Sequence, residues 1–397
     1  MATAVVVGAG VGGLAAAGAL ARLGWHVTLL ERGDRLRGTG GAVLLWPNGL
    51  AALGSLGLTL GDAAYPMAGG GIRRPDGRWL VQVDPETAAP PMVVHADDLH
   101  DALMAGLGER IEIRTRTEVT SVRAGVADRP AVGTGKHTFE ADLVVAADGA
   151  RSLIRQRLVP RSAVVSAGYT TWRAVIPWFR APDQVVPAGE MLGAGQRFVH
   201  ATLGERGHAG GSARGGIYWA ATAPGALRPE SPQTQLALLR RWFADWQAPV
   251  GDLLAATEPG DLVQQPGEEL RPLPRRFGFP VGGGGILLLG DAAHVASPTL
   301  TQGACLALED AATLRALVRV PGQAIATVLE EYTTARRARV ARVALVSRRL
   351  GGVLQARGRL SVRARDAVLG RIPPRLLDRV AASSSQWSPP PSGGASA

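Results

Sequence analysis

The chain is poor in cysteine, in lysine and in long apolar runs. Its 397 residues include one cysteine and one lysine, Lys136, and aromatic residues make up 5%. A single cysteine excludes an intrachain disulfide and a cysteine-based metal site, so we expect no metal ion. No apolar run approaches the roughly 18 residues that a membrane-spanning helix needs. The N-terminus lacks the basic segment of a secretory signal peptide, which leads us to expect a cytoplasmic protein.

The charge of the chain is unbalanced. There are 43 basic and 33 acidic residues, a formal net charge of +10, and all but one of the basic residues are arginines. The arginines are densest at 335–371, where valines and leucines recur at helical spacing. This pattern predicts an amphipathic helix with a solvated basic face rather than a nucleic-acid site. Such a face would also attract an anionic cofactor.

A glycine-rich turn connects an apolar strand to a helix near the N-terminus. Gly8, Gly10 and Gly13 form the pattern G-x-G-x-x-G within TAVVVGAGVGGLAAAGAL. The first glycine permits a tight turn, the second lets backbone approach a pyrophosphate, and the third allows close helix–strand packing. Glu31 ends the next predicted strand, where a carboxylate binds ribose hydroxyls. This βαβ unit predicts a site for FAD or NAD, because an acid there disfavours the 2′-phosphate of NADP.

Two later turns also follow buried strands. Asp148 and Gly149 come after LVVAA, and Gly290 and Asp291 come after GILLL. We expect Asp148 either to bind a ribose or to cap the following helix. We expect Asp291 to end its strand, where a ligand hydroxyl reaches its carboxylate.

A bend and a helix start follow Asp291. Pro298 fixes the bend, and Gln302, Gly303 and Ala304 begin a helix whose free N–H groups stabilise negative charge. A reduced flavin carries such charge on its pyrimidine edge. The motifs therefore predict one long ligand, with adenosine and pyrophosphate at the N-terminal turn and the ring at this distant one.

Together these motifs resemble the single-component FAD-dependent aromatic hydroxylases, which have the para-hydroxybenzoate hydroxylase fold. The resemblance covers about residues 3–350. It implies an α/β fold, in which a Rossmann-like FAD-binding domain carries an inserted β-rich substrate domain and C-terminal helices. We expect an FAD-binding domain at 1–70, 97–163 and 276–330, a substrate domain at 71–96 and 164–275, a helical segment at 331–381 and a disordered tail at 382–397.

The resemblance also implies roles for the matched residues. Glu31 would bind the adenosine ribose, Arg32 would lie by the adenine, and Asp291 would bind the ribityl chain. Asp148 would take part in handling FAD and NAD(P)H, and Pro298 would lie beside the reaction site. The expected cofactor-binding residues are Gly8, Gly10, Gly13, Glu31, Arg32, Gly41, Asp148, Gly290, Asp291, Gln302, Gly303 and Ala304.

The sequence motif P-x-x-x-Q-G-x-C, which begins at Pro298, resembles the motif of the subgroup that contains urate hydroxylases, 3-hydroxybenzoate 6-hydroxylases and zeaxanthin epoxidases. Two positions depart from the family pattern. Thr301 replaces the first glycine of G-Q-G, and Ala96 stands where relatives usually carry an arginine that contacts the flavin side. We expect FAD binding to persist and the positioning of the flavin to differ. Gln302 and His95 are the candidates to compensate for the missing arginine.

The resemblance implies an enzyme in which NADPH or NADH reduces FAD and O₂ then forms a flavin C4a-hydroperoxide. The distal oxygen would hydroxylate an aromatic or polycyclic small molecule, as in secondary metabolism. The flavin supplies the chemistry, while the protein orients the substrate and excludes water. The sequence leaves open whether the chain is a monomer or a homodimer.

Other flavoprotein activities remain as alternatives. An epoxidase or a Baeyer–Villiger-type monooxygenase would use the same fold, as would a non-catalytic flavin-binding protein. A flavin-dependent halogenase is disfavoured, because Ala174 replaces the second tryptophan of the W-x-W-x-I-P motif.

The candidate catalytic residues are Pro298, Arg173 and His200. Arg173 would anchor a substrate oxygen or steer the flavin, with a scaffold arginine as the alternative. His200 would deprotonate a phenol, since its ordinary pKa is about 6.5, with a structural histidine as the alternative.

His294 is expected to hold a turn. The aromatic residues Trp172, Tyr218 and Trp219 would either line a pocket or pack in the core.

Overall fold

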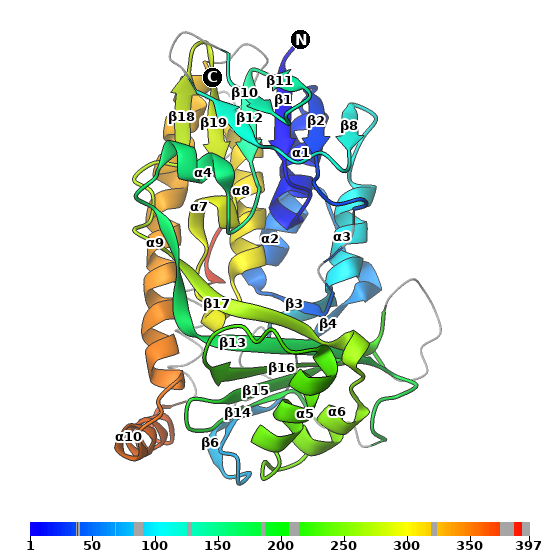
Figure 1. The fold of residues 1–397 in the computed structure, drawn as a ribbon, viewed down its shortest axis with the longest axis vertical. Helices are drawn as coiled ribbons and strands as arrows, with labels where there is room; N and C mark the ends of the chain where they lie inside the picture. The colour runs from blue at the N-terminus through cyan, green and yellow to red at the C-terminus, as the bar shows by residue number, and fades with distance from the viewer. Residues whose placement is uncertain are drawn as a thin grey trace.

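A computed structural model describes most of the chain. The described residues are 1–36, 38, 40–67, 69–82, 90–124, 129–183, 187–205, 214–318, 324–373 and 385–390. They form an upper half around one sheet and a lower half around another, connected along one side by a long helix (Figure 1). No helix among these residues is long and apolar enough to cross a membrane.

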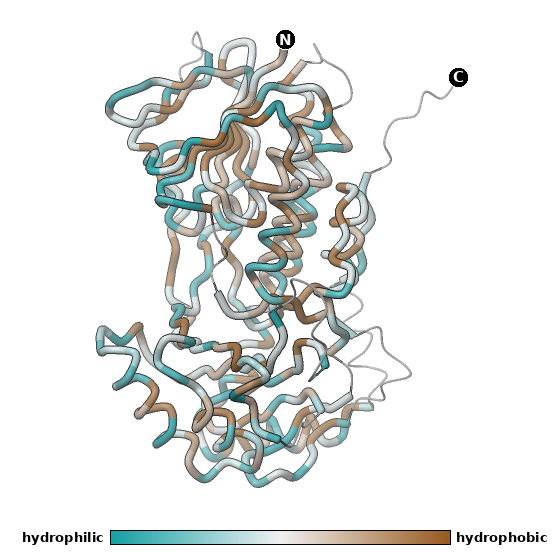
Figure 2. Tube along the Cα trace, turned by 90° about the vertical axis from the view of Figure 1, so that its right-hand side faces the viewer, coloured by the Kyte–Doolittle hydropathy of each residue, from teal (hydrophilic) through white to brown (hydrophobic). Residues whose placement is uncertain are grey.

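The upper half contains a six-stranded sheet. Its strand order is β18-β19-β12-β1-β2-β8, and β18 is the antiparallel edge strand. Strands β12 and β19 are buried along their whole length, as expected of parallel strands covered on both faces. Figure 2 shows hydrophobic residues gathered along these strands. The bounds are β1 Thr3–Val7, β2 His26–Leu30, β8 Ile111–Arg114, β12 Leu143–Ala146, β18 Gly278–Val281 and β19 Gly284–Leu288.

The lower half contains a seven-stranded sheet of order β17-β13-β16-β15-β14-β5-β6. One face packs on helices α5 and α6 around Trp172, Phe198 and Trp219. The other face looks toward the upper half (Figure 1). The bounds are β5 Gly71–Arg73, β6 Trp79–Gln82, β13 Ala163–Pro177, β14 Gly189–Leu192, β15 Arg197–Leu203, β16 Gly216–Pro224, β17 Val263–Arg271, α5 Pro232–Trp242 and α6 Val250–Ala256.

Two small sheets complete the β-structure. Strand β7 (Met92–His95) pairs with β3 (Ala42–Leu45) and β4 (Ala64–Pro66). Residues 92–95, which we assigned to the substrate domain, therefore extend this small sheet rather than the seven-stranded one. The second small sheet contains β9 Ser121–Arg123, β10 Ala131–Gly133 and β11 Thr138–Glu140.

Most of the remaining helices lie in the upper half, whereas α9 spans the two halves and α10 lies against the lower one (Figure 1). The 30-residue helix α9 packs against β18 and β19 and then runs down to α10 (Figure 1). The bounds are α1 Val11–Arg22, α2 Pro47–Ser55, α3 Ala96–Ala105, α4 Leu153–Leu158, α7 Asp291–His294, α8 Gly303–Leu317, α9 Ile325–Leu354 and α10 Arg359–Leu369, with short 3₁₀ helices η1 Gly61–Ala63, η2 Pro259–Asp261 and η3 Pro298–Leu300.

Part of the expected disordered tail is packed on the protein. Ser385 is buried, and Trp387 packs against the core of the upper half. The tryptophan thus finds apolar partners that the polar composition of the tail does not reveal, while the disorder of 382–397 stays a prediction. The remaining residues of 382–397 lie outside the described residues.

Candidate active site

One large cavity lies between the two halves. Its volume is about 2140 Å³, and it is lined by the glycine-rich turn, by the start of α8 and by one face of the seven-stranded sheet. Cavities that hold one small ligand usually measure about 300–1,000 Å³. This cavity therefore has room for a long cofactor and a second molecule beside it.

The glycine-rich turn offers bare backbone to the cavity. Gly8 has a φ of +100°, and a Cβ atom on Gly13 would lie 1.9 Å from the Gly8 oxygen. No atom lies within 4 Å of the place where Gly10 would carry a Cβ atom, and Gly10 lines the cavity. Thus Gly8 and Gly13 shape the turn, while Gly10 leaves open space where a pyrophosphate can approach the start of α1.

The adenosine end of the cavity is marked by Glu31. Its two carboxylate oxygens accept hydrogen bonds from Ala9 N and Gly33 N, each at 2.8 Å. Both Glu31 and Arg32 line the cavity, next to the glycine-rich turn. The backbone fixes this carboxylate in place, as a ribose-binding acid requires.

Asp148 has an unsatisfied carboxylate oxygen. Its Oδ2 accepts a hydrogen bond from Ile154 N at 3.4 Å, whereas its buried Oδ1 has no partner among the described residues. Burial raises the pKa of Asp148. Ser152, not Asp148, caps α4 through its side chain. Asp148 thus also accepts from an N–H of the first turn of α4, so it helps to hold the turn, and its Oδ1 remains available to a ligand hydroxyl.

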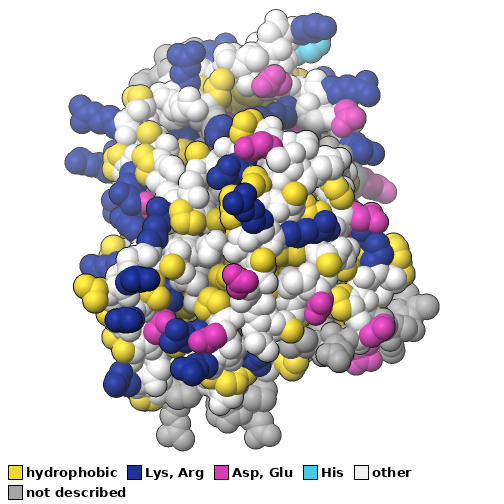
Figure 3. Space-filling view, turned by 60° about the horizontal axis from the view of Figure 1, so that its bottom comes forward, with side chains coloured by type: hydrophobic (Ala, Val, Ile, Leu, Met, Phe, Trp, Pro, Cys, Tyr) yellow, Lys and Arg dark blue, Asp and Glu magenta, His cyan; other side chains and the backbone are white. Residues whose placement is uncertain are grey.

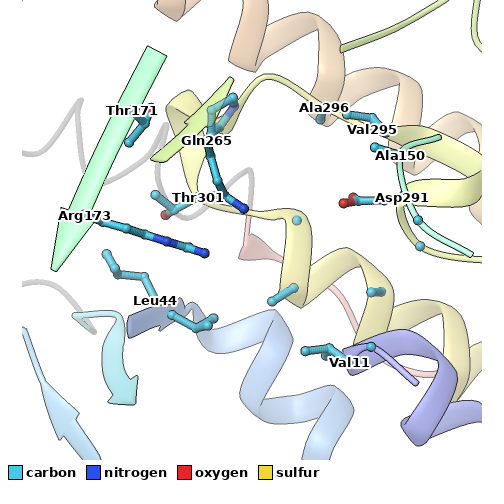
Figure 4. Close-up of a pocket in the computed structure, with 18 of the residues that line it drawn as sticks. Val11, Leu44, Ala150, Thr171, Arg173, Gln265, Asp291, Val295, Ala296 and Thr301 are labelled. Carbon is cyan, nitrogen blue, oxygen red and sulfur yellow. The ribbon is translucent and has the colours of Figure 1, made fainter. Parts of the chain in front are cut away.

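Asp291 points into the cavity (Figure 4). It begins α7, whereas β19 ends at Leu288, so the prediction that Asp291 ends the strand is wrong by one short turn. Gly290 makes this turn with a φ of +61°. The Asp291 side chain is exposed to the open cavity, but the protein around it removes water from its carboxylate and raises its pKa, although His294 and Arg155 oppose the rise. A ligand hydroxyl that donates to this carboxylate would lower the cost of its charge.

A buried charge network holds this turn. Asp310 on α8 accepts from Gly290 N at 2.8 Å and lies 2.6 Å from His294 Nε2. Arg336 on α9 lies 2.6 Å from Asp310 and 2.5 Å from Glu309. Burial alone would raise the pKa of Asp310, but His294 and Arg336 outweigh it and lower that pKa to about 2. His294 therefore holds the turn, as the sequence predicted.

The start of α8 is shaped by an unusual residue. Thr301 adopts a left-handed conformation with a φ of +53°, which is uncommon for a β-branched side chain. Its Oγ1 accepts from Trp46 Nε1 at 2.9 Å and donates to the Leu300 oxygen at 2.7 Å. Glycine adopts this conformation without strain, and the two hydrogen bonds explain how threonine is held in it. Gly303 follows and faces the cavity with its backbone.

Neither proposed compensating residue faces the cavity. The Gln302 side chain is buried and accepts from Asn48 Nδ2 at 2.8 Å. The His95 side chain caps α3 by accepting from Asp97 N at 3.2 Å. Gln302 therefore contributes only its backbone to the start of α8, where Ala304 lines the cavity.

A different cation approaches the helix that begins at Ala96. Arg214, which precedes β16, lies 2.5 Å from Asp98 and 3.0 Å from Asp101 on α3, and it lines the cavity. This contact could not be predicted from the sequence, since more than 100 residues separate Arg214 from α3. Arg214 thus ties the lower half to α3 at the cavity wall.

The seven-stranded sheet supplies the polar wall opposite the start of α8. The side chain of Arg173 extends from β13 into the cavity, with Thr171 and Gln265 beside it (Figure 4). Burial lowers the pKa of Arg173, while Tyr218 raises it. Across the strands, Arg173 is paired with the small residue Ala220, which leaves space above the sheet.

Arg197 was not anticipated from the sequence. It lines the cavity, lies 2.7 Å from Glu190 Oε1, and donates to the Thr299 oxygen at 3.2 Å. Thr299 belongs to the η3 turn that starts at Pro298, and Pro298 also lines the cavity. Arg197 therefore connects the sheet to the turn that carries Pro298.

His200 lies outside this site. It alternates with Val199, which lines the cavity, and its Nε2 lies 3.0 Å from the Pro187 oxygen. Burial lowers the pKa of His200 to about 4. The prediction of a substrate-facing base is corrected to a structural histidine, because the side chain points to the other face of the sheet. Trp172 and Trp219 pack on that face too, while Tyr218 lines the cavity.

The residues present fit FAD. The bare backbone at Gly10, the fixed carboxylate of Glu31, the unpaired oxygen of Asp148 and the carboxylate of Asp291 all line this cavity. This set matches a pyrophosphate flanked by two hydroxylated chains. The backbone at the start of α8 would meet the flavin ring.

Comparisons with known proteins agree with this reading. Residues 1–213 and 279–347 match the family model of the FAD binding domain. Aurachin C monooxygenase/isomerase of Stigmatella aurantiaca is 29% identical, covering 89% of this chain and 90% of that protein. The 2-heptyl-3-hydroxy-4(1H)-quinolone synthase of Pseudomonas aeruginosa is 31% identical, covering 79% and 80%.

Solved structures place the same fold on the whole chain. HpxO of Klebsiella pneumoniae, complexed with FAD and uric acid, has a TM-score of 0.82 and 26% identity over 97% of this chain and 96% of that one. Matches to 3-hydroxybenzoate 6-hydroxylase, urate hydroxylase and zeaxanthin epoxidase confirm the resemblance drawn from the motifs. The chain therefore belongs to the FAD binding domain family, and it is an FAD-dependent monooxygenase of the aromatic hydroxylase type.

Proposed function

We propose that this monooxygenase hydroxylates a fused-ring aromatic small molecule, with O₂ as oxidant and NADPH or NADH as electron donor. The observation that carries the proposal is the continuous cavity of about 2140 Å³, which joins the FAD-binding motifs to one face of the seven-stranded sheet. A one-ring substrate would leave much of the sheet end unfilled.

The lining of the sheet end supports a flat, largely apolar substrate. Small or aliphatic residues cover its floor, and the polar side chains stand at its edges. The floor residues are Ile72, Val81, Ala188, Gly189, Val199 and Ala220. Arg173 and Tyr218 stand on adjacent strands, close enough for each to affect the other's pKa. A ring system with one oxygen directed at this pair fits such a lining.

The relatives favour a nitrogen-containing ring system as the first class to test. One is named for aurachin C and another for a heptyl-hydroxyquinolone. The second name describes a 4-quinolone, which is a fused-ring molecule, and both relatives cover at least 79% of this chain. We therefore take 4-quinolones as the first candidate substrates.

Each residue has a limited task in this proposal. FAD, when bound, supplies the oxygenating chemistry, and NAD(P)H and O₂ are its reactants. Glu31, Asp148 and Asp291 hold the cofactor, and the α8 backbone stabilises negative charge on the ring. Arg173 holds the substrate oxygen, so that the reacting carbon faces the flavin. Arg197 positions the Pro298 turn through the Thr299 oxygen and so limits the entry of water.

Epoxidation is the second candidate outcome. Zeaxanthin epoxidase of tomato is 29% identical over 77% of this chain, although the match covers 46% of that longer protein. The same cavity would serve an alkene in place of an aromatic ring. Labelling with ¹⁸O₂ tests whether the added oxygen comes from O₂, and NMR spectroscopy of the product distinguishes a phenol from an epoxide or a ring-expanded lactone. The cytoplasmic location and the monomeric or homodimeric state expected from the sequence stay predictions.

Anaerobic reduction of the purified yellow protein tests the proposal. We expect NADPH or NADH to bleach the flavin spectrum, and a 4-quinolone to accelerate bleaching by tenfold or more. A one-ring control such as 3-hydroxybenzoate should accelerate it less. Stronger acceleration by the one-ring compound would contradict the proposed substrate class, and no bleaching with either donor would contradict the single-component monooxygenase.

A further inference from the structure

The corner of the molecule formed by the end of α9 and by α10 exposes apolar side chains among arginines. Leu360 is 80% exposed, Val368 59% and Val353 47%. Figure 1 shows α10 at the lower left, across the end of α9, and Figure 3 shows basic and hydrophobic side chains mixed on that side. We define the α9–α10 corner by the exposed residues Arg349, Val353, Arg357, Arg359, Leu360, Arg363, Val368 and Arg371.

The charge of this corner is almost purely positive. The segment 342–372 contains eight arginines and a single acid, Asp366. Asp366 is already engaged by Arg365 at 2.7 Å and by Arg74 at 3.8 Å. None of the five corner arginines forms an ion pair with a described residue, so their charge is uncompensated.

The inner side of α10 is firmly anchored. Arg365 is buried and donates to the carbonyl oxygens of Gly193 at 2.7 Å and of Leu192 and Leu354 at 3.3 Å. Leu369 packs in a cluster with Leu80. The helix is therefore held to the seven-stranded sheet by one face, and the outward direction of Leu360 and Val368 is fixed.

We propose that the α9–α10 corner docks the protein on an anionic lipid bilayer. Arginines beside lipid phosphates gain electrostatic attraction, while leucine and valine side chains enter the boundary between headgroups and acyl chains. Each basic residue near such a surface strengthens binding about fivefold. Five corner arginines, with apolar side chains between them, are enough for measurable partitioning.

Two other occupants fit the corner less well. A nucleic acid would use the arginines but would leave Leu360 and Val368 without a partner, since phosphate contacts need no apolar side chain. A second copy of the chain would bring two sets of uncompensated arginines together. The bilayer is the occupant that satisfies both the charge and the apolar side chains.

The corner lies on the helix turns that also close the cavity. Leu350, Gly351 and Leu354 line the sheet end of the cavity, while Arg349 and Val353 on the same turns are exposed. Docking would therefore place the wall of the substrate end beside the bilayer. This placement holds whichever substrate the enzyme takes.

Flotation of the FAD-loaded full chain with vesicles tests the proposal. Vesicles of phosphatidylcholine alone are compared with vesicles that also contain phosphatidylglycerol. We expect binding only to the anionic vesicles, weakened by salt. The variant R349Q/R359Q/R363Q should bind about 100-fold more weakly. The variant L360S/V368S should bind these vesicles about tenfold more weakly, since it removes two apolar side chains that would be partly buried in the bilayer.

A matched control removes three exposed arginines far from the corner, in R110Q/R157Q/R161Q. This control should bind like the parent. Flavin content and circular dichroism confirm that every variant is folded, which the exposure of the changed residues favours. The proposal is overturned if the parent ignores anionic vesicles or if the control loses as much as the corner variant.

Two further results would identify the other occupants. Unchanged vesicle binding by L360S/V368S, together with tight binding of duplex DNA by the parent, would indicate a nucleic-acid surface. A dimer in gel filtration that L360S/V368S dissociates, without vesicle binding, would indicate a second copy.

Discussion

The two ends of the cavity are built in opposite ways. The cofactor end uses backbone and short acids within three turns, each next to a parallel strand of the upper sheet. The substrate end uses long side chains from strands β13, β15 and β16, and their partners lie far away in the sequence, as with Arg197 and Thr299. Geometry at the first end depends on local conformation, and geometry at the second depends on how the sheets are brought together.

The largest effect is expected at the cofactor end, with Gly13→Ala. The new Cβ atom would lie 1.9 Å from the Gly8 oxygen, so the turn must deform. We expect a loss of stability above about 4 kcal/mol and little flavin-loaded protein. Gly10→Ala is the matched control, because its Cβ atom meets nothing. It should fold and bind FAD roughly tenfold more weakly. Flavin content and thermal unfolding are measured for both variants. Equal losses of stability and of flavin would contradict the conclusion that Gly13 shapes the turn while Gly10 leaves space for the pyrophosphate.

On the face of the seven-stranded sheet that points away from the cavity, His200 makes the stability of the fold depend on pH. Burial lowers its pKa to about 4 in the folded protein, whereas the unfolded value is about 6.5. The unfolded state binds more protons between these values, so stability falls as the pH drops from about 6.5 to 4, by about 3 kcal/mol. Urea unfolding at several pH values measures this slope. His200→Gln should flatten it and keep turnover, whereas a loss of turnover with an unchanged slope would restore a catalytic His200.

Arg173→Ala tests the substrate wall. We expect normal flavin content and a rise in KM of about 10- to 100-fold, because a charged hydrogen bond of about 1.5–3 kcal/mol is removed. Gln265→Ala, on the neighbouring strand, is the control with a smaller effect. Steady-state kinetics separate KM from kcat. A variant that loses flavin while KM is unchanged would assign Arg173 to the cofactor end.

The smallest effect is expected at Thr301, where the two ends meet. Thr301→Val keeps the shape but loses the hydrogen bond from Trp46, which should cost about 1 kcal/mol. Thr301→Gly loses the same bond but relieves a strained φ worth about 1–3 kcal/mol, so it should be nearly neutral or stabilising. Thermal unfolding compares the two. A glycine variant less stable than the valine variant would show that the left-handed conformation is not strained.

The difference between the ends also explains what the sequence could predict. Gly8, Gly10, Gly13, Glu31 and Asp291 could be predicted to line the cofactor end, because the signal of each lies in its own turn next to a strand; their roles in binding FAD stay predictions. The face on which a strand residue lies was harder to predict. His200 and Val199 are adjacent, yet one packs away from the cavity and the other lines it.

Contacts between residues that are far apart in the sequence could not be predicted from the sequence. The ion pairs of Arg214 with α3 and the packing of Trp387 against the upper half depend on tertiary contacts between distant segments. The strain at Thr301 was visible only as a departure from the family pattern, and the hydrogen bond from Trp46 that holds it was not.

We propose that one cavity holds the flavin ring and a fused-ring substrate in contact. Titration of the FAD-loaded protein with a 4-quinolone, followed by visible absorbance, tests this contact. We expect a saturable shift of the flavin bands at one substrate per flavin, which Arg173→Ala weakens. Binding detected by calorimetry without any change in the flavin spectrum would contradict it, because the substrate would then lie away from the ring.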